Sequence, residues 1–112
     1  EIHASQWLSP AEVLSKVEDK SMALLPPTIV TITELSRYKT VDSVINYYHD
    51  RPPVVFYPRV HVAEDDSTAV GQFTFLYQGD AGYQDTNPEA LGPRHRLNSK
   101  DGLWRYENTV YE

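Results

Sequence analysis

The sequence predicts an α+β fold, with helices in its first half and antiparallel strands in its second. Two observations carry this prediction. Helix-start signals fall in the first half, where Ser9 and Thr40 each stand just before an apolar stripe at helical spacing. After Pro53, apolar and polar residues alternate as they do in strands, and Asp101-Gly102 is a favourable hairpin turn.

The first predicted helix spans residues 10–19. Ser9 stands before it as an N-cap, a proline fills the first helical position, and Glu12 completes a capping box. Residues 1–7 alternate in character, so we expect a short strand there. This strand would deliver Trp7 to a fixed place, where its side chain staples the entering segment to the helix.

Two further helices are predicted before Pro52-Pro53. The β-branched run from Thr28 to Thr33 suggests a strand by propensity alone, but its apolar residues keep helical spacing, so we expect a helix over residues 27–38. Thr40 then caps a third helix, which ends near His49. The apolar face of this helix consists of Val41, Val44, Ile45 and Tyr48.

The second half of the chain predicts a sheet. Pro58 separates two of its strand-like segments and should lie at an edge or a bulge. We expect a polar turn at residues 64–67 and a loop at 81–93. No convincing linker separates the two halves, so residues 1–112 are interpreted as a single unit. The strand-like segments are residues 54–57, 60–62, 70–77, 94–98 and 103–106.

Composition argues against several classes of function. The formal net charge is −6 and the basic residues are scattered, so we expect no nucleic-acid partner. No apolar run is long enough to cross a membrane, so we expect no membrane partner. The absence of cysteine excludes disulfides and thiolate metal sites. It also fits a reducing compartment, and we expect an intracellular, cytoplasmic protein.

The one locally cationic stretch is Arg94-His95-Arg96. On a strand, Arg94 and Arg96 share one face, from which two guanidinium groups could hold a phosphate bidentately. The alternative is that both arginines lie at the surface and form ion pairs with nearby acidic side chains. Asp80, after a glycine, is interpreted as the first residue of an Asx-type turn. The histidines lack zinc-site spacing, and no metal-ligating residue is assigned.

Several motifs, in this order, resemble those of a branch of the Nudix hydrolases, the coenzyme A diphosphatases. Gln78 departs from the pattern, because proline is usual there. The resemblance implies part of an α/β/α sandwich with a mixed sheet. It rests on Trp7-Leu8-Ser9-Pro10-Ala11-Glu12 (W-x-S-P-x-E), Leu25-Pro26-Pro27-Thr28 (L-P-P-x), the short helix at Val41-Asp42-Ser43-Val44, the segment from Phe75 to Tyr83 (L-L-P-G-D-x-x-Y), and Arg94-His95-Arg96-Leu97 (H-R-I).

The Nudix box itself is absent, since no Arg-Glu pair followed by Glu-Glu occurs in the sequence. In the family the box precedes the W-x-S-P-x-E segment and supplies the glutamates that bind Mg²⁺ or Mn²⁺. The chain opens at Glu1 without Met. We therefore expect the C-terminal part of a larger Nudix domain, with the box on a missing N-terminal segment or on a second chain.

The resemblance implies a pyrophosphohydrolase that cleaves coenzyme A esters or nucleoside diphosphate derivatives. Its partner would be a small-molecule pyrophosphate substrate, and its cofactor Mg²⁺ or Mn²⁺, bound by no residue of this chain. Without the box the chain should be inactive alone, so no catalytic residue is assigned. The candidate substrate-binding residues are Trp7, Asp80, Arg94, His95 and Arg96.

Two other hypotheses stay open. The chain could be a non-catalytic binding or interaction module, with partner contacts on the loop at 81–93. It could also be an unrelated small α+β domain whose caps and turns match the family by chance. A Nudix box upstream would favour the enzyme, and an unrelated domain upstream would favour the module.

Overall fold

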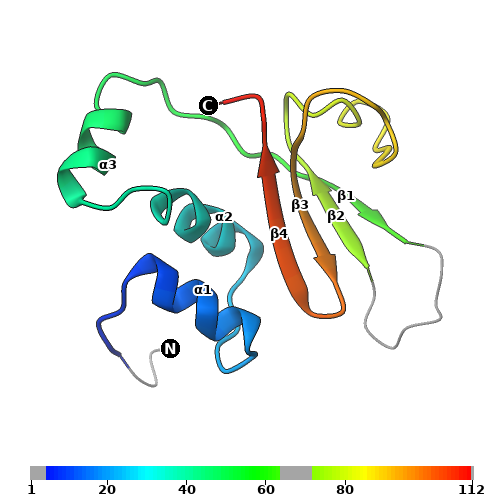
Figure 1. The fold of residues 1–112 in the computed structure, drawn as a ribbon. Helices are drawn as coiled ribbons and strands as arrows, with labels where there is room; N and C mark the ends of the chain where they lie inside the picture. Colours follow the sequence, from blue (N-terminus) through cyan, green and yellow to red (C-terminus); the bar gives the residue numbers. More distant parts are fainter. Residues whose placement is uncertain (1–4, 64–71, 112) are drawn as a thin grey trace. The chain divides into compact units, whose positions relative to one another are not determined.

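The computed structural model describes residues 5–63 and 72–111. Its contacts divide the chain after Arg51 into two compact units, Glu1–Arg51 and Pro52–Glu112. Among the described residues, the first unit holds three helices and the second a four-stranded antiparallel sheet (Figure 1). The predicted α+β class is therefore confirmed. The interpretation of the whole chain as one domain stays a prediction.

Helix α1 (Pro10–Glu18) begins with the predicted capping box. The backbone N–H of Glu12 donates to Ser9 Oγ over 3.2 Å, and the N–H of Ser9 donates to Glu12 Oε1 over 3.1 Å. Two free donors of the first turn are thus satisfied by side chains close in sequence. Local chemistry alone sets the start of this helix.

The predictions for the segment before α1 are wrong. Residues 5–9 form no strand, and the Trp7 side chain is fully exposed. The reason is positional: a hydrophobic staple acts from the residue directly before the cap, which is Leu8, and Leu8 is half-buried. Residues 1–4, which the predicted strand included, lie outside the described residues.

Helix α2 (Pro26–Leu35) confirms helix over strand for the β-branched run, although it ends three residues before Tyr38. The hydroxyl of Thr33 donates to the carbonyl of Ile29, four residues back, over 2.7 Å. That bond satisfies a polar side chain inside the helix. Ile29 and Val30 are almost fully buried, and α2 packs on α1. Burial of the apolar stripe therefore outweighs the intrinsic strand preference.

Helix α3 (Val41–Tyr48) has the predicted cap at Thr40, which exchanges hydrogen bonds with Ser43 in a second capping box. The Tyr48 hydroxyl donates to Glu34 Oε2 over 2.9 Å and links α3 to α2. None of the residues of α3 is fully buried, and Val41 is 74% exposed. Its predicted apolar face lies largely in solvent.

The sheet has strand order β1-β2-β3-β4, and every neighbouring pair is antiparallel. The resemblance implied a mixed sheet, but the described strands contain no parallel pair. Pro58 immediately precedes the edge strand β1, as predicted, and its missing N–H therefore breaks no ladder bond. The strands are β1 (Arg59–Val62), β2 (Phe73–Leu76), β3 (His95–Lys100) and β4 (Leu103–Asn108).

The predicted strand at residues 54–57 is wrong. Prolines on both sides remove backbone donors that a ladder would need. The segment instead packs against the residue that follows β2, since the ring centroid of Phe56 lies 5.1 Å from that of Tyr77. Strand β2 is described from Phe73 onward, and the predicted turn at 64–67 lies outside the described residues.

The hairpin of β3 and β4 confirms the predicted turn. Lys100 pairs with Leu103, and the two residues between them, Asp101 and Gly102, have φ values of 54° and 78°. Positive φ at both positions is the geometry of a type I′ turn, which matches the twist of the flanking strands. β3 is an interior strand, and its start lies at one end of the sheet, beside the loop at 81–93 (Figure 1).

Candidate functional site

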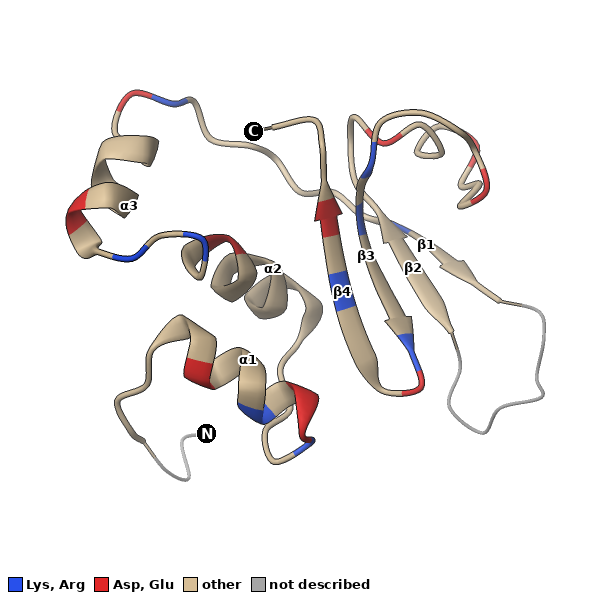
Figure 2. Cartoon of the chain, in the orientation of Figure 1, with Lys and Arg blue, Asp and Glu red and all other residues tan. Residues whose placement is uncertain are grey.

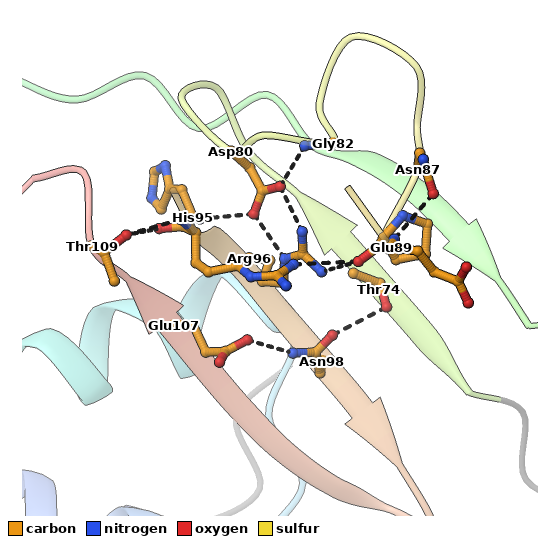
Figure 3. Close-up of polar contacts among 12 residues, drawn as sticks. Thr74, Asp80, Gly82, Asn87, Glu89, His95, Arg96, Asn98, Glu107 and Thr109 are labelled. Atoms are coloured by element: carbon orange, nitrogen blue, oxygen red, sulfur yellow. Dashed lines mark hydrogen bonds and ion pairs between the residues drawn. The ribbon is translucent and has the colours of Figure 1, made fainter. Parts of the chain in front are cut away.

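Asp80 lies at the centre of a buried cluster in the sheet unit (Figure 3). Its carboxylate accepts hydrogen bonds from the backbone N–H groups of Gly82 and His95, each over 2.8 Å. It also accepts from Arg96 Nε over 2.8 Å and from Arg96 Nη2 over 2.7 Å. The bond to Gly82 confirms the predicted Asx-type turn. Four donors thus converge on one carboxylate, which joins the start of the loop to β3.

Arg96 is almost as buried as Asp80, with its side chain 5% exposed and that of Asp80 fully buried. Besides its bidentate pair with Asp80, it donates from Nη1 to the carbonyl of Pro88 over 2.6 Å. Arg94 Nη1 donates to the same carbonyl over 3.3 Å. Arg94 and Arg96 therefore reach the same side of the strand, as their spacing predicts, and both hold the loop.

Burial and hydrogen bonding act on Asp80 in opposite directions. Burial by itself raises the pKa of this carboxyl group, because it disfavours the charged form. The hydrogen bonds from Arg96, Gly82 and His95, with the positive charge of Arg96, outweigh burial and lower the pKa below its ordinary value. Asp80 is therefore ionised at neutral pH and forms a charged pair with Arg96.

The side chain of His95 lies on the side of β3 opposite that of Arg96 and is fully buried. Its Nδ1 lies 2.8 Å from the carbonyl oxygen of Gln78, which can only accept, so we assign the ring proton to Nδ1. Nε2 then accepts from the Tyr106 hydroxyl over 2.9 Å. Four aromatic rings surround the imidazole, with centroids 5.1–5.9 Å away. These rings belong to Phe56, Tyr77, Tyr106 and Tyr111.

Arg59 and Tyr83 hold the other side of the loop, and the sequence did not predict this contact. Arg59 Nη1 donates to the carbonyls of Tyr83 and Gln84 over 3.2 and 2.6 Å, and its guanidinium lies 4.7 Å from the Tyr83 ring centroid. The Tyr83 hydroxyl donates to the carbonyl of Tyr57 over 2.8 Å. A loop without regular secondary structure is thus fixed at several points.

A polar network crosses the sheet on the Arg96 side. Thr74 Oγ1 donates to Asn98 Oδ1, and Asn98 Nδ2 donates to Glu107 Oε2, each over 3.1 Å. The register places Arg96 opposite Glu107. Figure 2 shows basic residues at the start of β3 with acidic residues along the neighbouring loop. This side of the sheet therefore offers polar groups of both signs.

The structure brings together four of the five candidate substrate-binding residues. Arg94 and Arg96 meet at the carbonyl of Pro88, and Asp80 pairs with Arg96. His95 lies on the other side of the same strand. Trp7 belongs to the first unit. That these residues bind a substrate stays a prediction.

The described residues contain no group of three or more His, Cys, Asp or Glu that could hold a metal ion. The carboxylate of Asp80 already accepts four hydrogen bonds. Within residues 5–63 and 72–111, no helix is long and apolar enough to span a membrane.

Comparison of the chain with protein-family models, with curated proteins and with solved structures finds no match.

Proposed function

We propose that this chain is the C-terminal part of a Nudix-type pyrophosphohydrolase that acts on coenzyme A esters or nucleoside diphosphate derivatives. The complete enzyme would cleave a pyrophosphate bond with Mg²⁺ or Mn²⁺ held by the glutamates of a Nudix box, which this sequence lacks. This part would supply a fixed loop beside the substrate, and alone it would have no hydrolase activity.

The observation that supports this proposal best is the Asp80 cluster. The two family-like segments of the second half, Gly79-Asp80 and His95-Arg96, lie apart in the sequence but share one hydrogen-bonded cluster. The pairing of β2 with β3 places the two segments side by side. The buried ion pair between Asp80 and Arg96 then joins one residue of each segment and fixes the loop that we propose lies beside the substrate.

The first experiment is to determine the upstream sequence of the natural protein. We expect a Nudix box within about one helix and one strand before Glu1, the separation that a compact βαβ-type unit needs. The longer protein should hydrolyse a coenzyme A ester when Mg²⁺ is added, and the isolated 112-residue chain should not. Turnover by the isolated chain, or an unrelated upstream domain, would contradict the proposal.

A second candidate is a non-catalytic interaction module, which the exposed apolar face of α3 favours. Val41, Ile45 and Tyr48 share this face and are 74%, 55% and 38% exposed. A contiguous exposed apolar face is typical of protein contacts. An upstream sequence that encodes an unrelated domain would select this candidate over the hydrolase.

A further inference from the structure

We propose that the guanidinium group of Arg94 binds a phosphate oxyanion, and that Arg96 and Asp80 position the loop behind it without contacting the ligand. The choice of pyrophosphate as the ligand rests on the proposed function. The division of work between the two arginines rests on their contacts alone. The sequence led us to expect that both guanidinium groups hold the phosphate together, whereas we now assign the phosphate to Arg94 alone.

Every nitrogen of the Arg96 guanidinium already donates a hydrogen bond inside the protein. Its Nε and Nη2 donate to the Asp80 carboxylate, and its Nη1 donates to the carbonyl of Pro88 over 2.6 Å. With only 5% of its side chain exposed, it does not meet solvent. A phosphate would have to break a buried ion pair to reach it, at a cost that few ligands could offset.

Arg94 is in the opposite position. Its side chain is half-buried, and within the described part of the chain its guanidinium makes one hydrogen bond, the 3.3 Å bond to Pro88. It shares that carbonyl with the much shorter bond from Arg96. A guanidinium group carries five N–H donors, so most of those of Arg94 remain for an anion. Exchange of a weak bond to a neutral carbonyl for charge-assisted bonds to an oxyanion is favourable.

Among the described residues of the sheet unit, Arg94 has no carboxylate partner within 4.0 Å. Two guanidinium groups converge on Pro88, and Asp80 neutralises one of them. In the described residues of the sheet unit, Asp80–Arg96 is the one ion pair within 4.0 Å. The carboxylate of Glu89 points away from this pair (Figure 3). The charge of Arg94 is therefore not neutralised by a close carboxylate of the part of the chain that the structure describes.

The test is a titration of the 112-residue chain with inorganic pyrophosphate, followed by NMR of backbone amides and of the Arg94 Nε–H. We expect saturable binding that Arg94→Gln weakens about tenfold, as loss of a charge-assisted hydrogen bond predicts. Arg94→Lys keeps the charge and loses the planar fork, so its affinity should fall between those of the wild type and Arg94→Gln. A parallel titration with inorganic phosphate should give weaker binding, because phosphate carries fewer anionic oxygens than pyrophosphate.

Arg105→Gln is the matched control, because it removes the same charge from an exposed position of β4. Its affinity for pyrophosphate should stay within about twofold of the wild type, since a distant exposed charge is screened. Equal losses in Arg94→Gln and Arg105→Gln, or no saturable binding by the wild type, would overturn the proposal. This titration involves no upstream segment, so the Arg94 site and the proposed enzyme can fail independently.

Discussion

Replacement of Asp80 by Asn should destabilise the sheet unit more than any surface change. The substitution keeps the shape of the side chain but removes the negative charge of the carboxylate, which accepts from two of the three nitrogens of the Arg96 guanidinium. Arg96 would then be a buried, uncompensated cation, since its side chain is 5% exposed. Breaking one partner of a buried pair costs about 3–5 kcal/mol. Because the asparagine side chain keeps one oxygen that can still accept from Arg96, we expect a loss at the lower end of this range, about 3 kcal/mol.

Urea unfolding followed by the fluorescence of Trp104 measures this loss. Trp104 lies on β4, and Trp7→Phe removes the other tryptophan of the chain from an exposed position. In a domain of this size, about 3 kcal/mol corresponds to a fall in Tm of roughly 12–24 °C. Asp85→Asn, an exposed change in the same loop, should alter the free energy of unfolding by less than about 0.5 kcal/mol.

The pH dependence gives a second check on Asp80. Because its pKa is lower in the folded chain, its contribution is present above the unfolded pKa of about 4 and is lost as pH falls through the folded value. The difference in the free energy of unfolding between the wild type and Asp80→Asn should thus be constant from neutral pH to about pH 5 and shrink below about pH 4. A loss under about 1 kcal/mol at pH 7, the size for a surface ion pair, would refute the reasoning.

Three further predictions concern other parts of the chain. Ser9→Ala should lower the stability of the helical unit by about 1 kcal/mol in circular dichroism melts, whereas Ser15→Ala, inside α1, should not. Burial raises the pKa of Tyr77 to about 12, so the free energy of unfolding of the wild type should fall as pH rises from about 10 to 12. Tyr77→Phe should reduce this fall, and Tyr57→Phe should not. His95→Phe should lower the free energy of unfolding in urea by about 1–3 kcal/mol, because the carbonyl of Gln78 loses its buried donor. His49→Phe, at an exposed residue, should lower it little. Equal losses in the two variants would argue against the assigned contact.

The elements that the sequence predicted correctly are those that short-range chemistry decides. Ser9 with Glu12, and Thr40 with its partner three residues on, satisfy the free donors of their helices within one turn. Asp101-Gly102 fixes a hairpin in the same way, because its two residues determine the turn type. Such signals need no knowledge of the rest of the fold.

The misses depend on contacts between distant residues. The segment at 54–57 has strand composition, but prolines deprive it of ladder donors and its contacts come from side chains such as Phe56. Arg96 looked like a surface cation because its partner, Asp80, lies 16 residues away. Nothing near Arg59 in the sequence indicated that it would hold the loop at Tyr83. Burial of a charge is decided by tertiary partners, which spacing does not reveal.

The measurement that tests the proposed function most directly is peptide mapping of the intact natural protein that contains this chain. We predict a longer protein, in which a peptide carrying the Arg-Glu and Glu-Glu pairs of a Nudix box lies upstream of Trp7-Leu8-Ser9-Pro10 in one polypeptide. A natural protein of 12.8 kDa, or one whose upstream peptides form an unrelated domain, would contradict the proposal.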